Sequence, residues 1–493
     1  MKIKFKLKSI IVFILLSMIS STSFAGGLLT NTNASARFAR IMALDASTNA
    51  DAAYYNPAGT IMLPEGIHFT LSNQSAAQQR IINSSFAPMT GAGSKEFVGK
   101  ASAPIIPSLQ GVYRKGKWAL SGNIALSGGG GKATFNDGLP SFESQISTLP
   151  PLINQFAGAM VGAIPGAELS ANGYSLNQYM EGTNYTFGAQ LGGTYKINEM
   201  FSAYAGFRLN IVHNSYEGHL TDLKLDMNIA GLEAAGLPTY KGMMDPTPIF
   251  GMAEGSGLLD AETQQKLALP KKMAADGVHL ESKQSGWGVA PIIGLHFNYE
   301  GLNIGAKYEF KNSLNVENRT KVDDTGMFAD GVNTAHDSPA LFTIGASYDI
   351  IPKLTASVGY HTFFDKDAKM ANDKQKHLSG NTNEYLAGLE FRINDMFLIS
   401  TGGQITQFGI TDAYQSDLSF TMDSYSIGFG GAVNLSEKTQ LNLGYFFTNY
   451  SDYTKTSSNY NNTPIPGTDD FVPGTDIYTR TNKLFAIGID FSF

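Results

Sequence analysis

The chain has 493 residues and a formal net charge of −7, and only 16% of its residues are charged. It contains 53 glycines, 31 phenylalanines and 22 tyrosines, which is typical of strands and turns and not of a soluble helical protein. It has no cysteine, which excludes disulfides and thiolate metal sites, and its acidic balance argues against a nucleic-acid partner.

Residues 1–25 have the organisation of a secretory signal peptide. Lys2, Lys4, Lys6 and Lys8 precede an apolar run from Ile10 to Ile19, and the run ends in the small residues that a signal peptidase recognises. The run is too short for a membrane anchor. Cleavage after Ala25 would remove four positive charges and no negative ones, which changes the net charge to −11. No later apolar stretch reaches the roughly 18 residues that a transmembrane helix needs.

Residues 26–65 are neither charged like a solvated tail nor alternating like a strand. Small residues dominate from Ala34 to Ala58, and Phe38, Tyr54 and Tyr55 argue against a disordered leader. We interpret this segment as a plug inside a barrel. We expect it to start on the periplasmic side and to form a helical turn or two near residues 34–44.

From residue 66 onward, apolar and polar residues alternate. Between Leu302 and Phe310 one face carries apolar side chains and the other carries Asn, Gly, Lys and Glu. A period of two predicts strands with one apolar face, and therefore an all-β fold. We expect fourteen strands, near 66–78, 103–114, 117–127, 183–196, 199–213, 285–299, 302–315, 339–350, 353–364, 381–393, 396–410, 420–435, 438–451 and 481–493.

The connections between these strands alternate between very short and very long. Long ones are expected near 81–102, 128–182, 214–284, 316–338, 365–380, 411–419 and 452–479. Short periplasmic turns and long external loops are typical of outer-membrane barrels, which have an even number of strands. The pattern predicts a 14-stranded antiparallel transmembrane β-barrel over 66–493, in the cell outer membrane of a Gram-negative bacterium.

Small residues recur on the inward face of the predicted strands. Because they leave space in the lumen, they favour a plug over an open pore. They are Gly188, Gly192, Gly206, Gly305, Gly345, Gly359, Gly388, Gly402, Gly428, Gly430, Gly444 and Gly488.

Within the plug, Tyr55-Asn56-Pro57-Ala58-Gly59 follows the stretch Ala43–Ala50. Here the chain resembles the long-chain fatty acid transporter family of the outer membrane, which also includes importers of aromatic hydrocarbons. The resemblance covers the signal peptide, the motif, the strand count and the terminal Phe493. It implies a fourteen-stranded barrel with an N-terminal hatch, here 26–65, and Tyr55 to Gly59 as the hatch motif.

The resemblance also implies passive uptake of a hydrophobic compound, with long-chain fatty acids as the leading expectation. We expect a monomer that needs no cofactor. Ligand would be caught by apolar external loops, held above the hatch, and released sideways at a kinked third strand. Neither composition nor alternation distinguishes a fatty acid from an aromatic hydrocarbon as the ligand. The other expected partner is the lipid of the outer membrane.

Loop 128–182 contains an apolar stretch that is expected to face water, and such stretches usually mark a binding surface. The alternative is that this loop and loop 214–284 pack on each other as a lid. The residues that we assign to a capture surface are Leu152, Ile153, Phe156, Met160, Val161 and Ile164.

Arg208, Lys307 and Arg392 point inward by parity and are candidates to bind a ligand carboxylate. The alternative is pairing with lumen carboxylates, for which Arg37 and Arg40 of the hatch are equal candidates. The inward-facing histidines His296 and His361 show no metal-ligand spacing, so no metal site is expected.

The third strand runs into Gly128, Gly129, Gly130 and Gly131, and four glycines permit unusual dihedral angles. This is where the resemblance places a lateral gap, although a flexible start to the loop is an equal alternative. For the whole protein the alternative function is a structural or adhesive barrel that binds partners through its long loops. An enzyme is not expected, because no nucleophile-elbow motif is present.

Overall fold

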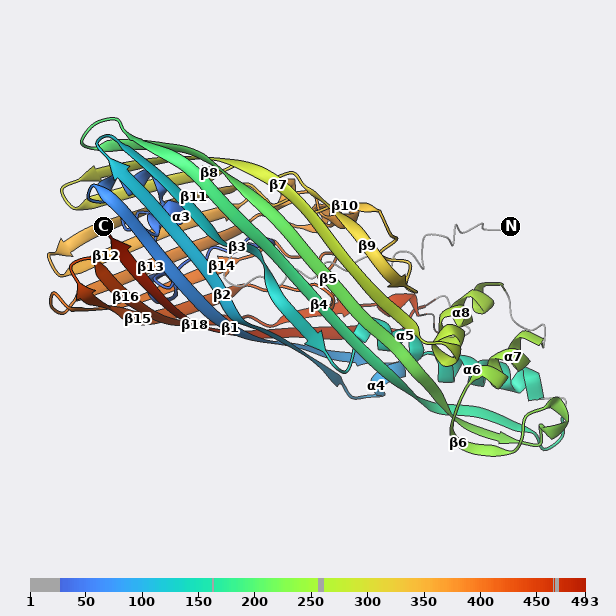
Figure 1. Cartoon of the computed structure of the whole chain (residues 1–493). Helices are drawn as coiled ribbons and strands as arrows, with labels where there is room; N and C mark the ends of the chain where they lie inside the picture. The colour runs from blue at the N-terminus through green and yellow to red at the C-terminus, as the bar shows by residue number, and fades with distance from the viewer. Residues whose placement is uncertain (1–26, 162–163, 256–260, 464, 466–469) are drawn as a thin grey trace.

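The computed structural model describes residues 27–161, 164–255, 261–463, 465 and 470–493, with the backbone alone at 156, 158–160, 235, 261–266 and 461. The predicted signal peptide lies outside the described residues. Every named strand belongs to one antiparallel sheet, and its first and last strands pair from His68–Ser492 to Phe86–Gly474. This pairing closes the sheet into a barrel of tilted strands (Figure 1).

The sheet has eighteen strand segments, which make fourteen crossings of the wall. β8 and β9 both pair with β7 and together form one crossing. β11 pairs with β8 and β10 pairs with β9, so β10 and β11 form the next crossing. Each of these two crossings is interrupted once. β6 (Tyr240–Met244) and β17 (Tyr453–Ser457) are short additions outside the wall. The predicted fourteen-stranded antiparallel barrel is therefore confirmed. The wall strands are β1 (Gly66–Phe86), β2 (Lys95–Lys115), β3 (Trp118–Phe135), β4 (Glu168–Lys196), β5 (Phe201–Ala230), β7 (Val278–Tyr299), β8 (Leu302–Glu309), β9 (Asn315–Asp323), β10 (Asn333–Ala335), β11 (Leu341–Ile351), β12 (Leu354–Phe363), β13 (Thr382–Arg392), β14 (Phe397–Gln407), β15 (Ser424–Ser436), β16 (Thr439–Tyr450) and β18 (Gly474–Ser492).

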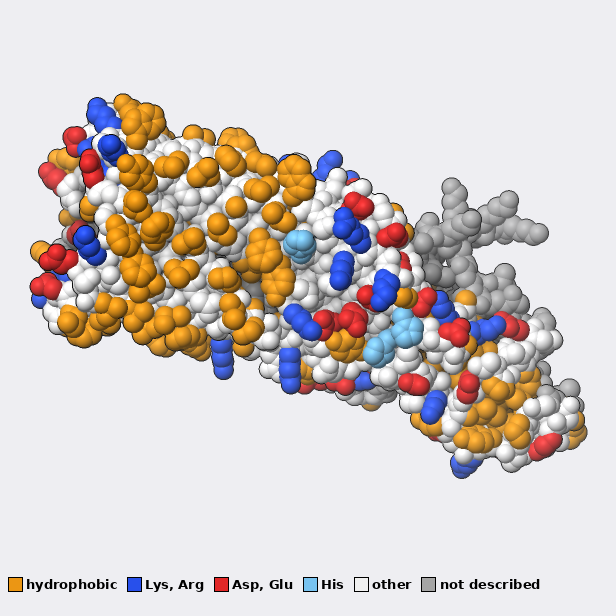
Figure 2. Space-filling view, viewed as in Figure 1, with side chains coloured by type: hydrophobic (Ala, Val, Ile, Leu, Met, Phe, Trp, Pro, Cys, Tyr) orange, Lys and Arg blue, Asp and Glu red, His pale blue; other side chains and the backbone are white. Residues whose placement is uncertain are grey.

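The outward side chains of the wall form an apolar belt, with charged side chains beyond it at both ends (Figure 2). Leu191, Leu295 and Phe485 lie on separate strands of this belt and are all exposed. Trp118 and Tyr195 contact each other at the end with the short turns, with ring centroids 4.6 Å apart, as in the aromatic girdle of a membrane barrel. Because so much exposed apolar surface is unfavourable in water, the belt is the surface that faces lipid.

The strands extend well beyond this belt, so several of the predicted loops consist partly of strand. β1 runs to Phe86 and β2 starts at Lys95, so most of 81–102 is strand. β4 and β5 have 29 and 30 residues and take up much of 128–182 and 214–284. Above the membrane the outward residues are polar, so the apolar period fades while the antiparallel ladder continues.

Helices pack at the outer end of the barrel around an apolar cluster of their own (Figure 1). The cluster joins residues of both long connections, for example Ile153 with Ile249 and Phe250, so these connections do pack on each other. No helix among the described residues is long and apolar enough to cross a membrane. The helices of the outer end are α4 (Ala87–Thr90), α5 (Pro140–Ile146), α6 (Leu149–Val161), α7 (Thr247–Gly255) and α8 (Ala261–Ala275), and the short turns of 3-10 helix are η3 (Glu233–Ala235), η4 (Asp365–Asp367), η5 (Ala371–His377) and η6 (Tyr460–Asn462).

Residues 27–65, which we call the hatch, fill the lower lumen. They contain α2 (Phe38–Ile41), α3 (Ala52–Tyr55) and η2 (Pro57–Met62). The expectation that the segment starts on the periplasmic side is wrong. Leu28 packs against Met370 and Tyr414 of the outer loops, and the hatch ends beside the periplasmic turns at Glu65, which accepts a hydrogen bond from Gly116 N.

Most of the inward glycines make room for the hatch, as their positions predict, whereas Gly188, Gly192 and Gly206 face atoms of the wall. A Cβ atom at Gly402 would lie 2.1 Å from Ile41 O, and one at Gly305 would lie 2.0 Å from Asp45 O. Gly428 and Gly444 approach the backbone of α2 in the same way. Any side chain at these positions would push the hatch away from the wall.

Candidate functional site

The hatch motif is fixed to the wall by hydrogen bonds. Asn56 Nδ2 donates to Ser47 O at 3.0 Å and lies 3.0 Å from His296 Nδ1. Thr194 Oγ1 donates to Pro57 O at 2.7 Å, and Ser202 Oγ donates to Ala58 O at 2.7 Å. Two wall strands, β4 and β5, therefore bind the main chain of the motif, and a third, β7, contacts the Asn56 side chain.

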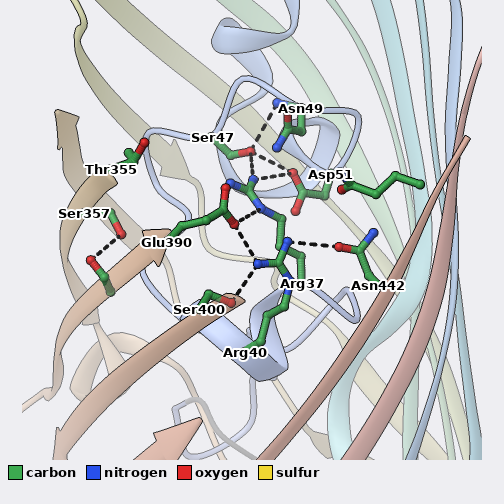
Figure 3. A network of polar contacts seen from close by, with 12 residues as sticks. Arg37, Arg40, Ser47, Asn49, Asp51, Thr355, Ser357, Glu390, Ser400 and Asn442 are labelled. Carbon is green, nitrogen blue, oxygen red and sulfur yellow. Dashed lines mark hydrogen bonds and ion pairs between the residues drawn. The ribbon is translucent and has the colours of Figure 1, made fainter. Parts of the chain in front are cut away.

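Two arginines of the hatch bind one carboxylate of the wall (Figure 3). Arg40 Nη1 lies 2.6 Å from Glu390 Oε2, and Arg37 Nε lies 3.8 Å from the same oxygen. Arg40 also donates to Ser400 Oγ at 2.7 Å and to Asn442 Oδ1 at 3.0 Å, so it joins three strands. The expected pairing of Arg37 and Arg40 with a lumen carboxylate is thus present.

Arg208 and Lys307 are buried, and both contact the hatch. Arg208 Nη1 donates to both oxygens of Glu309 at 2.7 Å, and its guanidinium lies 4.9 Å from the centre of the Tyr54 ring. Lys307 Nζ donates to Tyr54 O at 2.9 Å. Both groups are therefore occupied in holding α3, and contact with a ligand carboxylate stays a prediction for them.

The other sequence-predicted polar residues lie elsewhere. Arg392 is exposed at the periplasmic end of β13, away from the other two cations. His361 lies 2.8 Å from Asp45 Oδ1 of the hatch and 2.8 Å from Glu384 Oε2 of the wall, which makes it a further hatch mount. No group of metal-binding side chains is found in the part of the chain that the structure describes.

The four glycines lie where the ladder between β2 and β3 is broken. Pairing stops after Leu109–Ile124 and resumes at Ser102–Lys132, so residues 103–108 of β2 have no partner on β3. Over 125–131 the strand loses its alternation and all seven residues are buried, because it bends into the lumen. Gly129 and Gly131 have φ angles of 83° and 79°, which other residues rarely adopt.

The hatch holds this bend in place. Asn31 N donates to Ser127 O at 2.9 Å, and Asn31 Nδ2 donates to Gly129 O at 2.8 Å. On the other side of the break, β2 carries Pro104 and Pro107, which have no N–H to offer to a neighbouring strand. The break is therefore built into both strands and is contacted from inside by the start of the hatch.

Above the hatch, the lumen is lined by aromatic and aliphatic side chains, a region that we call the chamber. It surrounds a cavity of about 20 Å³, room for about one water molecule. The cavity is lined by Arg80, Ala133, Phe135, Leu139, Met180, Gly182, Tyr216 and Leu418.

Arg80 is the charged residue in the lining of this cavity, and sequence reasoning missed it. Its side chain is 2% exposed, and its Nε and Nη2 have no hydrogen-bond partner among the described residues. It lies directly opposite Arg480 in the β1–β18 ladder and under the Phe420 ring, at 5.7 Å from the centroid. The predicted strands ended at 78 and began at 481, so both arginines fell just outside them.

Phe420 belongs to the connection between β14 and β15, which folds into the barrel mouth. Ser141 N donates to Asp417 Oδ2 at 2.7 Å, and Lys455 Nζ donates to Gln415 O at 2.7 Å. Burial also affects Lys374 in η5, whose ammonium lies 4.4 Å from the centre of the Tyr414 ring. It lowers the pKa of that ammonium to about 7, so Lys374 carries only part of its charge near neutral pH.

A groove of about 290 Å³ lies outside the chamber, between α5, α8 and the outer parts of β4, β5 and β7. Phe142, Leu269, Met273 and Leu280 are among its apolar lining residues, and the Lys272–Asp324 ion pair lies at its rim. None of the residues predicted for the capture surface is among the lining residues of this groove.

The residues predicted for the capture surface lie on or just after α6. Ile153 is buried, Leu152 and Val161 are half-buried against the outer cluster, and Ile164 is exposed. The side chains of Phe156 and Met160 lie outside the described part of the chain. Capture by this helix stays a prediction.

No family model matches the sequence, and no curated protein matches it. The crystal structure of a Pseudomonas aeruginosa FadL homologue is similar to this chain with a TM-score of 0.60 and 12% identity, covering 97% of this chain and 99% of that one. A crystal structure of the Pseudomonas putida toluene transporter TodX is similar with a TM-score of 0.52 and 15% identity, covering 96% and 100%. The fold implied by the sequence resemblance is therefore confirmed over nearly the whole chain.

Proposed function

We propose that this chain is an outer-membrane channel for passive uptake of hydrophobic compounds, and that its ligands are long-chain fatty acids. The observation that carries the choice of ligand is Arg80, a buried guanidinium that faces an apolar cavity. A buried charge without a partner is costly, so a buried cation that faces a cavity is a candidate binding group for an anionic ligand.

The chemistry of the chamber suits a fatty acid better than an aromatic hydrocarbon. A carboxylate is a planar acceptor that a guanidinium binds through two parallel hydrogen bonds. Phe135, Met180 and Tyr216 supply apolar contacts for an acyl chain. TodX is described as a toluene transporter, and toluene has no group that would compensate the Arg80 charge.

The proposed route has four steps. Ligand binds in the groove between α5 and α8 and then enters the chamber. Movement of the hatch releases the bend that Asn31 holds at Ser127 and Gly129. The ligand then leaves sideways through the break between β2 and β3, whose rim is formed by the apolar residues Ala103, Ile106, Ala125 and Leu126.

The test is uptake of labelled oleate and labelled toluene by cells that carry this protein as their only importer. Arg80→Met should reduce oleate uptake about tenfold or more, because a buried charge-assisted hydrogen bond is lost, and should leave toluene uptake unchanged. Arg80→Lys should retain part of the oleate uptake. Arg392→Met is the matched control, because it removes an exposed cation.

The heat-modifiable folded band on a gel establishes that each variant is assembled. Equal oleate uptake by Arg80→Met and the unsubstituted protein, with the folded band present, would overturn the fatty-acid assignment. Absence of uptake of either compound by the unsubstituted protein would overturn the channel function itself.

A further inference from the structure

The groove and the chamber are two separate hollows that share one wall. Met180 lines both of them. Phe142 of α5 packs against both the apolar cluster of the outer helices and that of the chamber. These two side chains therefore form the partition between the external hollow and the internal one.

Met180 belongs to a row of inward side chains that crosses four neighbouring strands. Phe135 of β3 lies opposite Met180 of β4, Met180 lies opposite Gly218 of β5, and Gly218 lies opposite Leu280 of β7. Gly218 is a gap in this apolar row. A Cβ atom there would lie 3.1 Å from Met180 Sδ and 3.0 Å from Tyr179 O, so the thioether lies over the glycine.

The partition is closed in this structure. The chamber cavity of about 20 Å³ is far smaller than an acyl chain, so a ligand enters only when side chains of the chamber move. Of the residues in the row, Met180 moves most easily, because methionine is unbranched and has three rotatable side-chain bonds. Its neighbour Gly218 offers it space without a side chain to displace.

We propose that Met180 is the residue that sets the rate at which ligand passes from the groove into the chamber. The inference rests on the proposed function and adds the position of the slow internal step. The passage runs between Met180 and Leu280 over Gly218, and rotation of the thioether opens it to an acyl chain.

Because the chain has no native cysteine, single reporters can follow the two hollows separately. Gln145→Cys places an environment-sensitive fluorophore in the groove, and Leu418→Cys places one in the chamber; both positions are half-buried. Oleate is mixed with the purified protein in detergent, and both signals are recorded by stopped flow. In the protein that carries a reporter and retains Met180, the groove signal should change first and the chamber signal later.

Met180→Phe adds rigid volume and should slow the chamber signal roughly tenfold, while the groove signal still appears and still precedes it. Met180→Ala should have the opposite effect on the chamber signal, and Met180→Leu, which conserves volume, should resemble the unsubstituted protein. General damage to the fold would not move two variants in opposite directions while sparing the groove.

An unchanged chamber rate in both Met180→Phe and Met180→Ala would overturn the role of Met180 and leave the proposed function intact. A chamber reporter that does not respond to oleate in the unsubstituted protein would overturn both proposals. A chamber signal that precedes the groove signal in the unsubstituted protein would also reject the partition, because ligand would then reach the chamber by another route.

Discussion

The lower and upper parts of the lumen bury arginines equally well but use them differently. Arg40 and Arg208 are at most 1% exposed, and Arg80 is 2% exposed. In the lower lumen each guanidinium lies within 2.7 Å of a carboxylate. Arg40 joins the hatch to the wall through this pair, and Arg208, paired within the wall, contacts Tyr54 of the hatch. In the chamber Arg80 faces a second arginine and an aromatic ring. The arginines of the lower lumen hold the hatch in position, whereas Arg80 in the chamber is available for a ligand.

The comparison predicts that substitutions in the two regions change stability with opposite signs. In the lower lumen, loss of a cation leaves a buried carboxylate without its partner, which is destabilising. In the chamber, loss of a cation removes an uncompensated charge beside a like charge, which is stabilising.

The largest effect is expected for Arg40→Met. It removes the closest cation from Glu390 and also the bonds to Ser400 and Asn442, so the free energy of unfolding should fall by about 3 kcal/mol. The measurement is urea unfolding of the protein in lipid vesicles. Arg319→Met is the control, because Arg319 is exposed on an outward face. Equal stability of the two variants would contradict the role of Arg40 as a mount.

A smaller effect is expected for Gly402→Ala, which brings a Cβ atom to 2.1 Å from Ile41 O of the hatch. Overpacking of this kind should cost about 2 kcal/mol in the same unfolding experiment. The next residue supplies a matched control, since a Cβ atom at Gly403 would be 3.6 Å from Ser426 O, an ordinary contact. If Gly403→Ala were as harmful as Gly402→Ala, strand propensity and not hatch packing would be the cause.

Asn56→Ala should cost between about 1 and 2 kcal/mol, because Ser47 O and His296 lose a buried partner. The barrel should still assemble, since its ladders do not involve Asn56, while transport of oleate should slow. Uptake and the heat-modifiable folded band are measured on the same cells. Disappearance of the folded band would show that the motif serves folding.

The smallest change, of opposite sign, is expected for Arg80→Met. It should raise the free energy of unfolding by about 1 kcal/mol, because a buried charge opposite Arg480 is replaced by an apolar side chain of similar length. Urea unfolding without added fatty acid is the appropriate measurement. A loss of stability like that of Arg40→Met would mean that Arg80 is a structural cation, and the contrast between the two regions would disappear.

Alternation allowed the wall to be predicted from the sequence wherever it faces lipid. There every second residue is apolar, as in β8, and the inward parity of Arg208 and Lys307 followed directly. The space for the hatch was also predictable, because two backbones approach closely where one of them carries glycine, and the glycines are visible in the sequence.

The chamber escaped prediction because it lies above the lipid. There the outward residues are polar, so a strand resembles a loop, and Arg80 was placed at the edge of one. A signal for strand above the lipid did exist in β5, where Leu223, Leu225, Met227 and Ile229 alternate with polar residues and are buried in the outer apolar cluster. The contact of Arg80 with Phe420 joins segments 340 residues apart, and no local pattern encodes such a meeting.

The position of the hatch also constrains the order of biogenesis. Residues 27–61 are nearly all buried inside a wall whose seam joins β1 to β18, the first strand and the last. α2 contacts β13 to β16, which are synthesised late, and it does so through their inward glycines. A segment enclosed in this way reaches its place most directly when the wall is still an open sheet. The hatch would then act as a template around which the sheet curls before its seam is sealed.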